Sequence, residues 1–66
     1  MEKENIKCHL REIRIKRNLS QTDIAIAMNV KQTTVSEWEN NNNIPNLKIA
    51  YKLSELLEVN VTDIWK

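Results

Sequence analysis

The chain has 66 residues, a net charge of +1, a single cysteine and no glycine. This length limits it to one domain, residues 1–66, whose core is too small to wall a catalytic cleft, so a binding surface suits it better than an enzyme site. One cysteine excludes an internal disulfide and fits a reducing cytoplasm, and no apolar run approaches the length of a membrane span.

The first helix is predicted from Ile6, Leu10 and Ile13, which recur at helical spacing. Asn18 is expected to end it, because asparagine tolerates the left-handed conformation better than most side chains. This part of the chain holds most of the basic side chains: Lys3, Lys7, Arg11, Arg14, Lys16 and Arg17. The simplest interpretation of each of these charges is the solvated face of a helix, so they alone do not indicate nucleic acid.

A second helix is predicted to begin at Ser20, because Asp23 follows three residues later and completes a capping box. Its buried stripe consists of three apolar residues: Ile24, Ala25 and Met28. Asn29 and Val30 then break the helix. We expect Asn29 to adopt positive φ and the apolar Val30 to point inward.

The third helix is predicted over Gln32 to Asn40, with two different faces. Val35 and Trp38 share one face and are expected to pack inside, whereas the opposite face is polar. That polar face consists of Gln32, Thr33, Ser36 and Glu37. Two short helices joined by a tight turn indicate a helix-turn-helix, whose second helix enters the major groove of double-stranded DNA. Many helical hairpins share this periodicity, so the pattern alone is a weak indication.

The rest of the chain is predicted to form two more helices after a polar loop at residues 40–43. Pro45 disfavours helix in the residue before it, and Asn46 is suited to cap the fourth helix. The apolar stripe of that helix is Leu47, Ala50, Leu53 and Leu57. Asn60 is expected to cap a short fifth helix, with Ile64 and Trp65 closing the core. The predicted fold is therefore all-α, with five helices.

The segment "LREIRIKRNLSQTDIAIAMNVKQTTVSEWEN", from Leu10 to Asn40, resembles the Cro/repressor family of helix-turn-helix proteins. The tail "IPNLKIAYKLSELLEVNVTDIWK" is similar to the fourth and fifth helices of that family, and "LSQTDIA" and "VSEWEN" are the most specific parts of the match. The resemblance implies a compact phage-repressor-like DNA-binding domain. It also implies a sequence-specific transcriptional regulator of a prokaryote or phage, a repressor that binds a palindromic operator as a homodimer.

The resemblance further implies that Gln32, Thr33 and Glu37 read base edges, and the exposed face adds Ser36 to this set. Gln21, at the start of the second helix, would contact a backbone phosphate and brace Gln32. Asn40 would contact another phosphate. No cofactor, small-molecule ligand or membrane is implied.

Arg14 and Glu39 match a buried ion pair that ties the first helix to the end of the third. Other positions depart from the family. Asn29 and Asn41 replace glycines, and Glu58 ends the fourth helix where glycine is common, at a cost of about 1 kcal/mol if it is left-handed. The loop 40–46 lacks an arginine to enter a minor groove.

Lys31 is a further departure, because it replaces the usual serine or threonine cap of the third helix. The lysine side chain cannot accept a hydrogen bond from the first amides of that helix, so those amides stay free to bind a phosphate oxygen. The positive charge of Lys31 would lie beside that phosphate.

Homodimerisation is expected to use the C-terminal part, which has more apolar side chains than one short helix buries. The candidate contacts are Leu56, Val59, Val61 and Ile64. The alternative function is a protein-binding module of the antitoxin type, for which Ile15 and Ile26 are candidate contacts because they lie off the predicted stripes. Cys8 and His9 diverge on a helix, so they form neither a catalytic pair nor a metal site.

Overall fold

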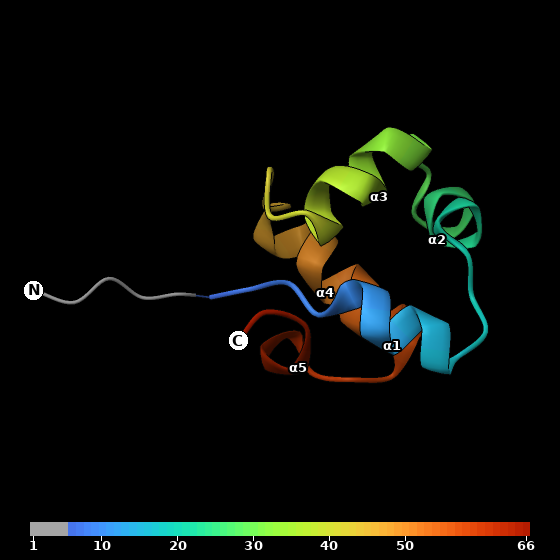
Figure 1. Cartoon of the computed structure of the whole chain (residues 1–66). Coiled ribbons are helices and arrows are strands. Elements are labelled where there is room, and N and C mark those ends of the chain that lie inside the picture. The colour runs from blue at the N-terminus through green and yellow to red at the C-terminus, as the bar shows by residue number, and fades with distance from the viewer. Residues whose placement is uncertain (1–5) are drawn as a thin grey trace, which may run out of the picture.

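Five helices make up residues 6–66, the part of the chain that the computed structural model describes (Figure 1). They are α1 (Leu10–Lys16), α2 (Gln21–Met28), α3 (Gln32–Glu39), α4 (Leu47–Leu57) and α5 (Val61–Ile64). The prediction of an all-α fold is confirmed. Of the basic residues considered above, Lys3 lies outside the described part. No helix in residues 6–66 has the length and apolar character needed to cross a membrane.

The prediction that the first helix includes Ile6 is wrong, because α1 begins only at Leu10 and Ile6 is exposed. The residues before α1 instead pair with the C-terminal end of the chain. The amide of Lys7 donates to the carbonyl of Lys66 at 3.0 Å, and the reverse bond measures 3.1 Å. Figure 1 shows these two segments side by side. This pairing satisfies backbone groups that a longer α1 would have bonded internally.

Tight turns are made without glycine. Within residues 6–66, four residues have positive φ: Asn18, Asn29, Asn41 and Glu58. Each turn is closed by a backbone hydrogen bond that spans five residues, such as Val30 N–H to Ala25 O at 2.9 Å. Three of the four positions hold asparagine, the non-glycine residue that accepts this conformation best. The left-handed conformation expected of Asn29 is confirmed, and Glu58 adopts the same conformation.

The core lies between α2, α3 and α4, with α1 and α5 closing it. The fully buried side chains are Leu10, Ile24, Val35, Leu53, Leu57 and Ile64. Trp38 is also buried, as predicted. The sequence suggested that both Ile64 and Trp65 close the core. Ile64 is fully buried there, whereas Trp65 is half-buried and packs against the edge of the core.

The predicted dimer contacts change with this packing. Ile64 is fully buried within one chain, so it cannot contact a second copy, and that assignment is wrong. Leu56 is 39% exposed, whereas Val59 and Val61 are half-buried. Ile15 and Ile26 are both exposed, consistent with their place off the predicted stripes.

Candidate nucleic-acid interface

Helix α3 has one buried and one exposed side. Val35 and Trp38 anchor it in the core, while Gln32, Thr33 and Glu37 are exposed. Ser36 is half-buried, which gives it the shortest reach of the predicted base readers. Figure 1 shows α3 at the edge of the molecule, beside α2 and away from α5. The helix therefore presents its polar side chains outward from a fixed position.

The turn between α2 and α3 sets the relative position of the two helices. At the start of α2, the Asp23 amide donates to Ser20 Oγ at 3.0 Å, and the Ser20 amide donates to the Asp23 carboxylate at 2.9 Å. The backbone hydrogen bond from Ser20 lowers the pKa of Asp23, and the Ser20 hydroxyl lowers it further. At the end of α2, Asn29 has φ 58° and the half-buried Val30 packs against the core. Both ends of α2 are thus stabilised locally.

Glu39 at the end of α3 forms an ion pair with Arg14 of α1. Arg14 Nε lies 2.5 Å from Glu39 Oε2, and Arg14 Nη2 donates to Oε1 at 3.3 Å. The Glu39 side chain is 0% exposed and that of Arg14 is 13% exposed. Arg14 also donates to the carbonyl of Leu19 at 3.1 Å, so the same guanidinium holds the connection between α1 and α2.

Burial by itself would raise the pKa of Glu39, because it penalises the charged form. Hydrogen bonds from Arg14, Gln21 and Arg11, together with the charge of Arg14, outweigh that effect and hold the pKa below its ordinary value. Glu39 is therefore ionised at neutral pH and acts only as a hydrogen-bond acceptor.

Gln21 connects this ion pair to the exposed face of α3. Its Nε2 donates to Glu39 Oε1 at 2.9 Å, and its Oε1 accepts from Gln32 Nε2 at 3.2 Å. Gln21 and Gln32 therefore lie in contact, as the family resemblance implied. Sequence reasoning missed the bond between Gln21 and Glu39, since the two residues lie on different helices and no spacing rule relates them.

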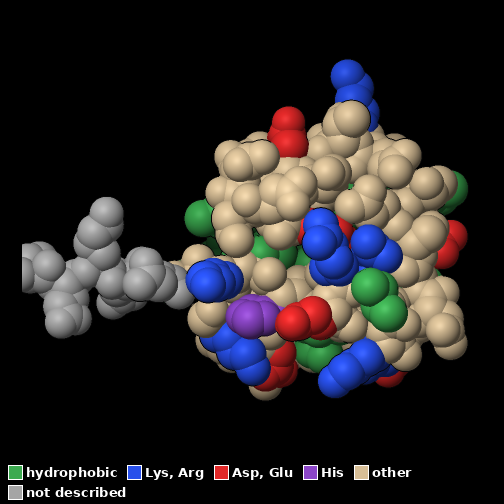
Figure 2. All heavy atoms as spheres, in the orientation of Figure 1, with side chains coloured by type: hydrophobic (Ala, Val, Ile, Leu, Met, Phe, Trp, Pro, Cys, Tyr) green, Lys and Arg blue, Asp and Glu red, His purple; other side chains and the backbone are tan. Residues whose placement is uncertain are grey.

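The predicted phosphate contacts lie around the ends of α3. Lys31 precedes the helix, is exposed and makes no side-chain capping bond, while Asn40 follows it and is also exposed. Asn40 Oδ1 accepts from Arg11 at 3.4 Å. Arg11 thus places a cation at this edge that sequence reasoning did not assign; its spacing of three residues from Arg14 was the available signal. In Figure 2, the surface over α3 is mostly uncharged (tan), and basic side chains (blue) gather over α1 below it.

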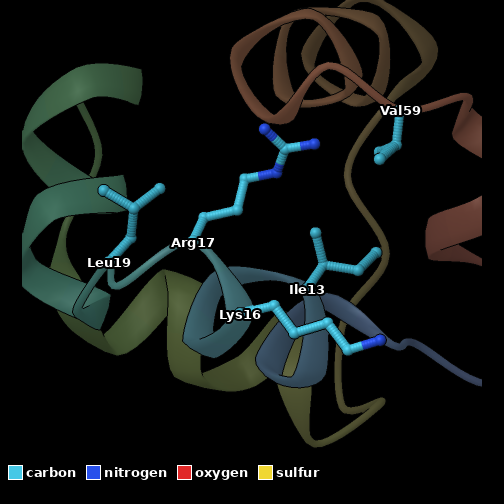
Figure 3. A pocket seen from close by; sticks show the side chains of 5 residues that line it. All are labelled: Ile13, Lys16, Arg17, Leu19 and Val59. Carbon is cyan, nitrogen blue, oxygen red and sulfur yellow. The ribbon is translucent and has the colours of Figure 1, made fainter.

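The remaining surface offers less chemistry. The side chains that line an open hollow beside α1 are Ile13, Lys16, Arg17, Leu19 and Val59 (Figure 3). Burial raises the pKa of the Cys8 thiol, which keeps it protonated at neutral pH. Within residues 6–66, no group of three His, Cys, Asp or Glu side chains is arranged to hold a metal ion.

Comparison with known proteins agrees with this geometry. Residues 10–64 match the profile of the family described as Helix-turn-helix. An uncharacterised helix-turn-helix-type transcriptional regulator of Archaeoglobus fulgidus is 28% identical over 60 residues, which cover 91% of this chain and 84% of that protein. A crystal structure of a protein from Bacteroides fragilis that is proposed to bind DNA superposes with a TM-score of 0.86 at 21% identity. It covers 94% of this chain and 100% of that one.

The buried and exposed sides of α3 and the turn before it define a helix-turn-helix protein of the DNA-binding class. Because the family match spans nearly the whole described chain, the protein belongs to the Cro/repressor-type helix-turn-helix family. It is a DNA-binding transcription regulator and not an enzyme.

Proposed function

We propose that this protein is a prokaryotic or phage repressor that binds a palindromic operator as a homodimer. In this proposal it acts in the cytoplasm. The observation that carries the proposal is the exposed polar side of α3 opposite a fully buried anchor. A helix held in this way reads base edges in the major groove without rearranging when it binds.

Each exposed side chain of α3 has a preferred base partner. The amide of Gln32 suits a purine in the major groove, and the carboxylate of Glu37 accepts from cytosine N4. The methyl group of Thr33 packs against the methyl group of thymine, and its hydroxyl serves either base of a pair. Ser36, which is half-buried, contributes only where a base edge approaches closely.

Gln21, Lys31 and Asn40 contact phosphates on the two sides of α3 and fix its register on the duplex. Such contacts give affinity and orientation but carry no sequence information. Lys31 supplies the only formal charge among the three residues, so we expect a modest salt dependence for each protomer.

The homodimer is needed because one recognition helix reads only a few base pairs. Two copies place their α3 helices about one DNA turn, roughly 34 Å, apart on one side of the duplex. In our proposal the second copy covers Leu56 together with Val59 and Val61. The connection from α4 to α5, which holds Val59, lies away from α3 in Figure 1, so this contact leaves α3 free for DNA.

The test begins with selection of bound sequences from a random duplex pool. Gln32→Ala should then weaken binding to the selected operator by about 1–3 kcal/mol, since it removes a bidentate base contact. Binding to unrelated duplexes should stay the same. Thr62→Ala, at an exposed position on α5, is the matched control and should change neither affinity. Equal weakening on operator and unrelated DNA by Gln32→Ala would contradict the base-reading role.

A further inference from the structure

The hollow beside α1 continues into a second hollow along the same helix. The two share Ile13, Lys16 and Val59, so together they form one groove between α1 and the connection from α4 to α5. From His9 at one end to Arg17 at the other, the groove follows about 12 Å of chain at the helical rise of about 1.5 Å per residue. That length matches about two turns of another helix.

Half-buried apolar side chains form the floor of this groove. Ile13, Leu19 and Val59 pack against the core on one side and are only partly covered on the other (Figure 3). Because the groove is open, it would cover too little of a small molecule, whose sites usually enclose most of the ligand. The groove instead suits the apolar stripe of an amphipathic helix, which is a common way for one protein to bind another.

The cations beside this floor have few partners within the chain. Among residues 6–66, no acidic side chain lies within salt-bridge distance of Lys16 or Lys66. Arg17 has one such partner, since its Nη1 lies 3.4 Å from Glu58 Oε1. Both side chains of that pair are exposed, and such pairs are weak, so Arg17 can exchange Glu58 for another carboxylate at little cost.

Two acidic side chains lie at the α5 end of the groove, and both are bonded within the chain. Glu12 Oε1 lies 3.0 Å from His9 Nδ1, and Asp63 Oδ2 accepts from the amide of Asn60 at 3.0 Å. The cations are therefore the charges that remain to meet a partner. They favour acidic side chains on both sides of the apolar stripe of a bound helix.

DNA bound by α3 does not explain these cations. Among the described residues that line the two hollows, none belongs to α3. Figure 1 shows α3 away from α5 and from the connection that holds Val59. A duplex in contact with α3 therefore leaves the groove open to a protein.

We propose that this groove binds an acidic amphipathic helix of a partner protein, and that the partner lifts repression by competing with the second copy of the chain. The competition arises at Val59, which lines the groove and is also a contact in the proposed homodimer. The competition rests on the proposed function, whereas the docking does not.

The first experiment selects binders of the full chain from a random peptide library, and synthetic copies of the selected peptides serve as probes. These peptides should carry large apolar residues at helical spacing with Asp or Glu beside them. Lys16→Glu with Arg17→Glu should weaken their binding by about tenfold or more, because attraction becomes repulsion. Lys48→Glu with Lys52→Glu, at exposed positions on α4, changes the net charge equally and should alter affinity by less than about twofold.

Nuclear magnetic resonance spectra of the isotopically labelled protein locate the bound peptide. The backbone amide signals of residues 13–19 and Val59 should move, and those of α3 should stay. Val59→Thr nearly keeps the shape of the side chain but puts a hydroxyl group under the peptide, so it should weaken binding severalfold while the fold persists.

Three results would overturn the docking: selected peptides without acidic residues, signals that move on α3 instead of at the groove, or equal weakening by the two pairs of charge reversals. A fourth concerns DNA. If Lys16→Glu with Arg17→Glu weakened binding to duplexes more than Lys48→Glu with Lys52→Glu, the cations would serve DNA and the docking would be refuted.

The second experiment adds the probe peptide to the protein bound to its selected operator. The peptide should release the operator and convert dimers to monomers in sedimentation, and Lys16→Glu with Arg17→Glu should resist both effects. A peptide that binds the groove but leaves the dimer intact would overturn the competition and leave the docking in place. If the protein binds its operator as a monomer without any peptide, the proposed homodimer fails, and the competition fails with it.

Discussion

Replacing Glu39 with glutamine should lower the free energy of unfolding by about 3 kcal/mol. Breaking a buried ion pair by removing one charge costs about 3–5 kcal/mol, because the other charge stays buried without its partner. We expect the lower end of this range of free energies for two reasons. Arg14 keeps its hydrogen bond to the Leu19 carbonyl, and Arg11, whose side chain is 56% exposed, is readily solvated by water. A chain of this length has a total stability of about 3–10 kcal/mol, so the loss removes a large part of it.

The assay is thermal and urea unfolding followed by circular dichroism. A loss of about 3 kcal/mol corresponds to a fall in melting temperature of roughly 12–24 °C for a domain of this size. The pair between Arg17 and Glu58 supplies a control, because the two side chains are 40% and 78% exposed and such pairs contribute about 0–1 kcal/mol. Equal destabilisation by Glu39→Gln and Arg17→Gln would refute the argument from burial.

Other predictions follow from the same structure. The pKa of Glu39 is lowered in the folded protein, so the stability that its ionised form contributes is complete above the ordinary carboxylate pKa of about 4.3. This stability is lost as the pH falls through the lower pKa of the folded state. In urea titrations, acid should therefore destabilise the wild type more steeply than Glu39→Gln. Glu58→Gly should raise the free energy of unfolding by about 1 kcal/mol by relieving the left-handed conformation, and a melting temperature below that of the wild type would contradict this. Lys31→Ala should reduce the slope of log affinity against log salt by about 1 per protomer, with an unchanged slope as the contrary result. Leu56→Glu should weaken dimers in sedimentation experiments, whereas Tyr51→Glu, on a different side of α4, should not.

The helices and their turns were largely predictable from the sequence, because local signals determine them. Ser20 with Asp23, and Asn46 before α4, mark helix starts through side-chain bonds that the sequence places within reach. Asn29 marked a left-handed turn for the same local reason. Ile6 was the exception, since pairing of the neighbouring backbone with residues at the other end of the chain decided its conformation.

The site was predictable in its exposed side chains but not in the bonds between them. Helical periodicity placed Gln32 and Glu37 outside and Trp38 inside. The contacts of Glu39 with Arg11 and Gln21 depend on how three helices pack, which periodicity within one helix does not give. Ile64 was misassigned for a related reason, because the apolar pattern does not distinguish a monomer core from a dimer contact.

Helix α3 has only eight residues, which must both anchor it in the core and present polar side chains to DNA. So short a helix is not stable by itself, and its position comes from the burial of Val35 and Trp38. Burial of those side chains fixes where the helix lies but leaves the exposed amide of Gln32 free to rotate. The buried charge of Glu39, acting through Gln21, is the element that extends order from the core to that amide. Substitutions at Trp38 should therefore weaken DNA binding through loss of the fold, whereas substitutions at Gln21 should free the amide of Gln32 in a protein that still folds.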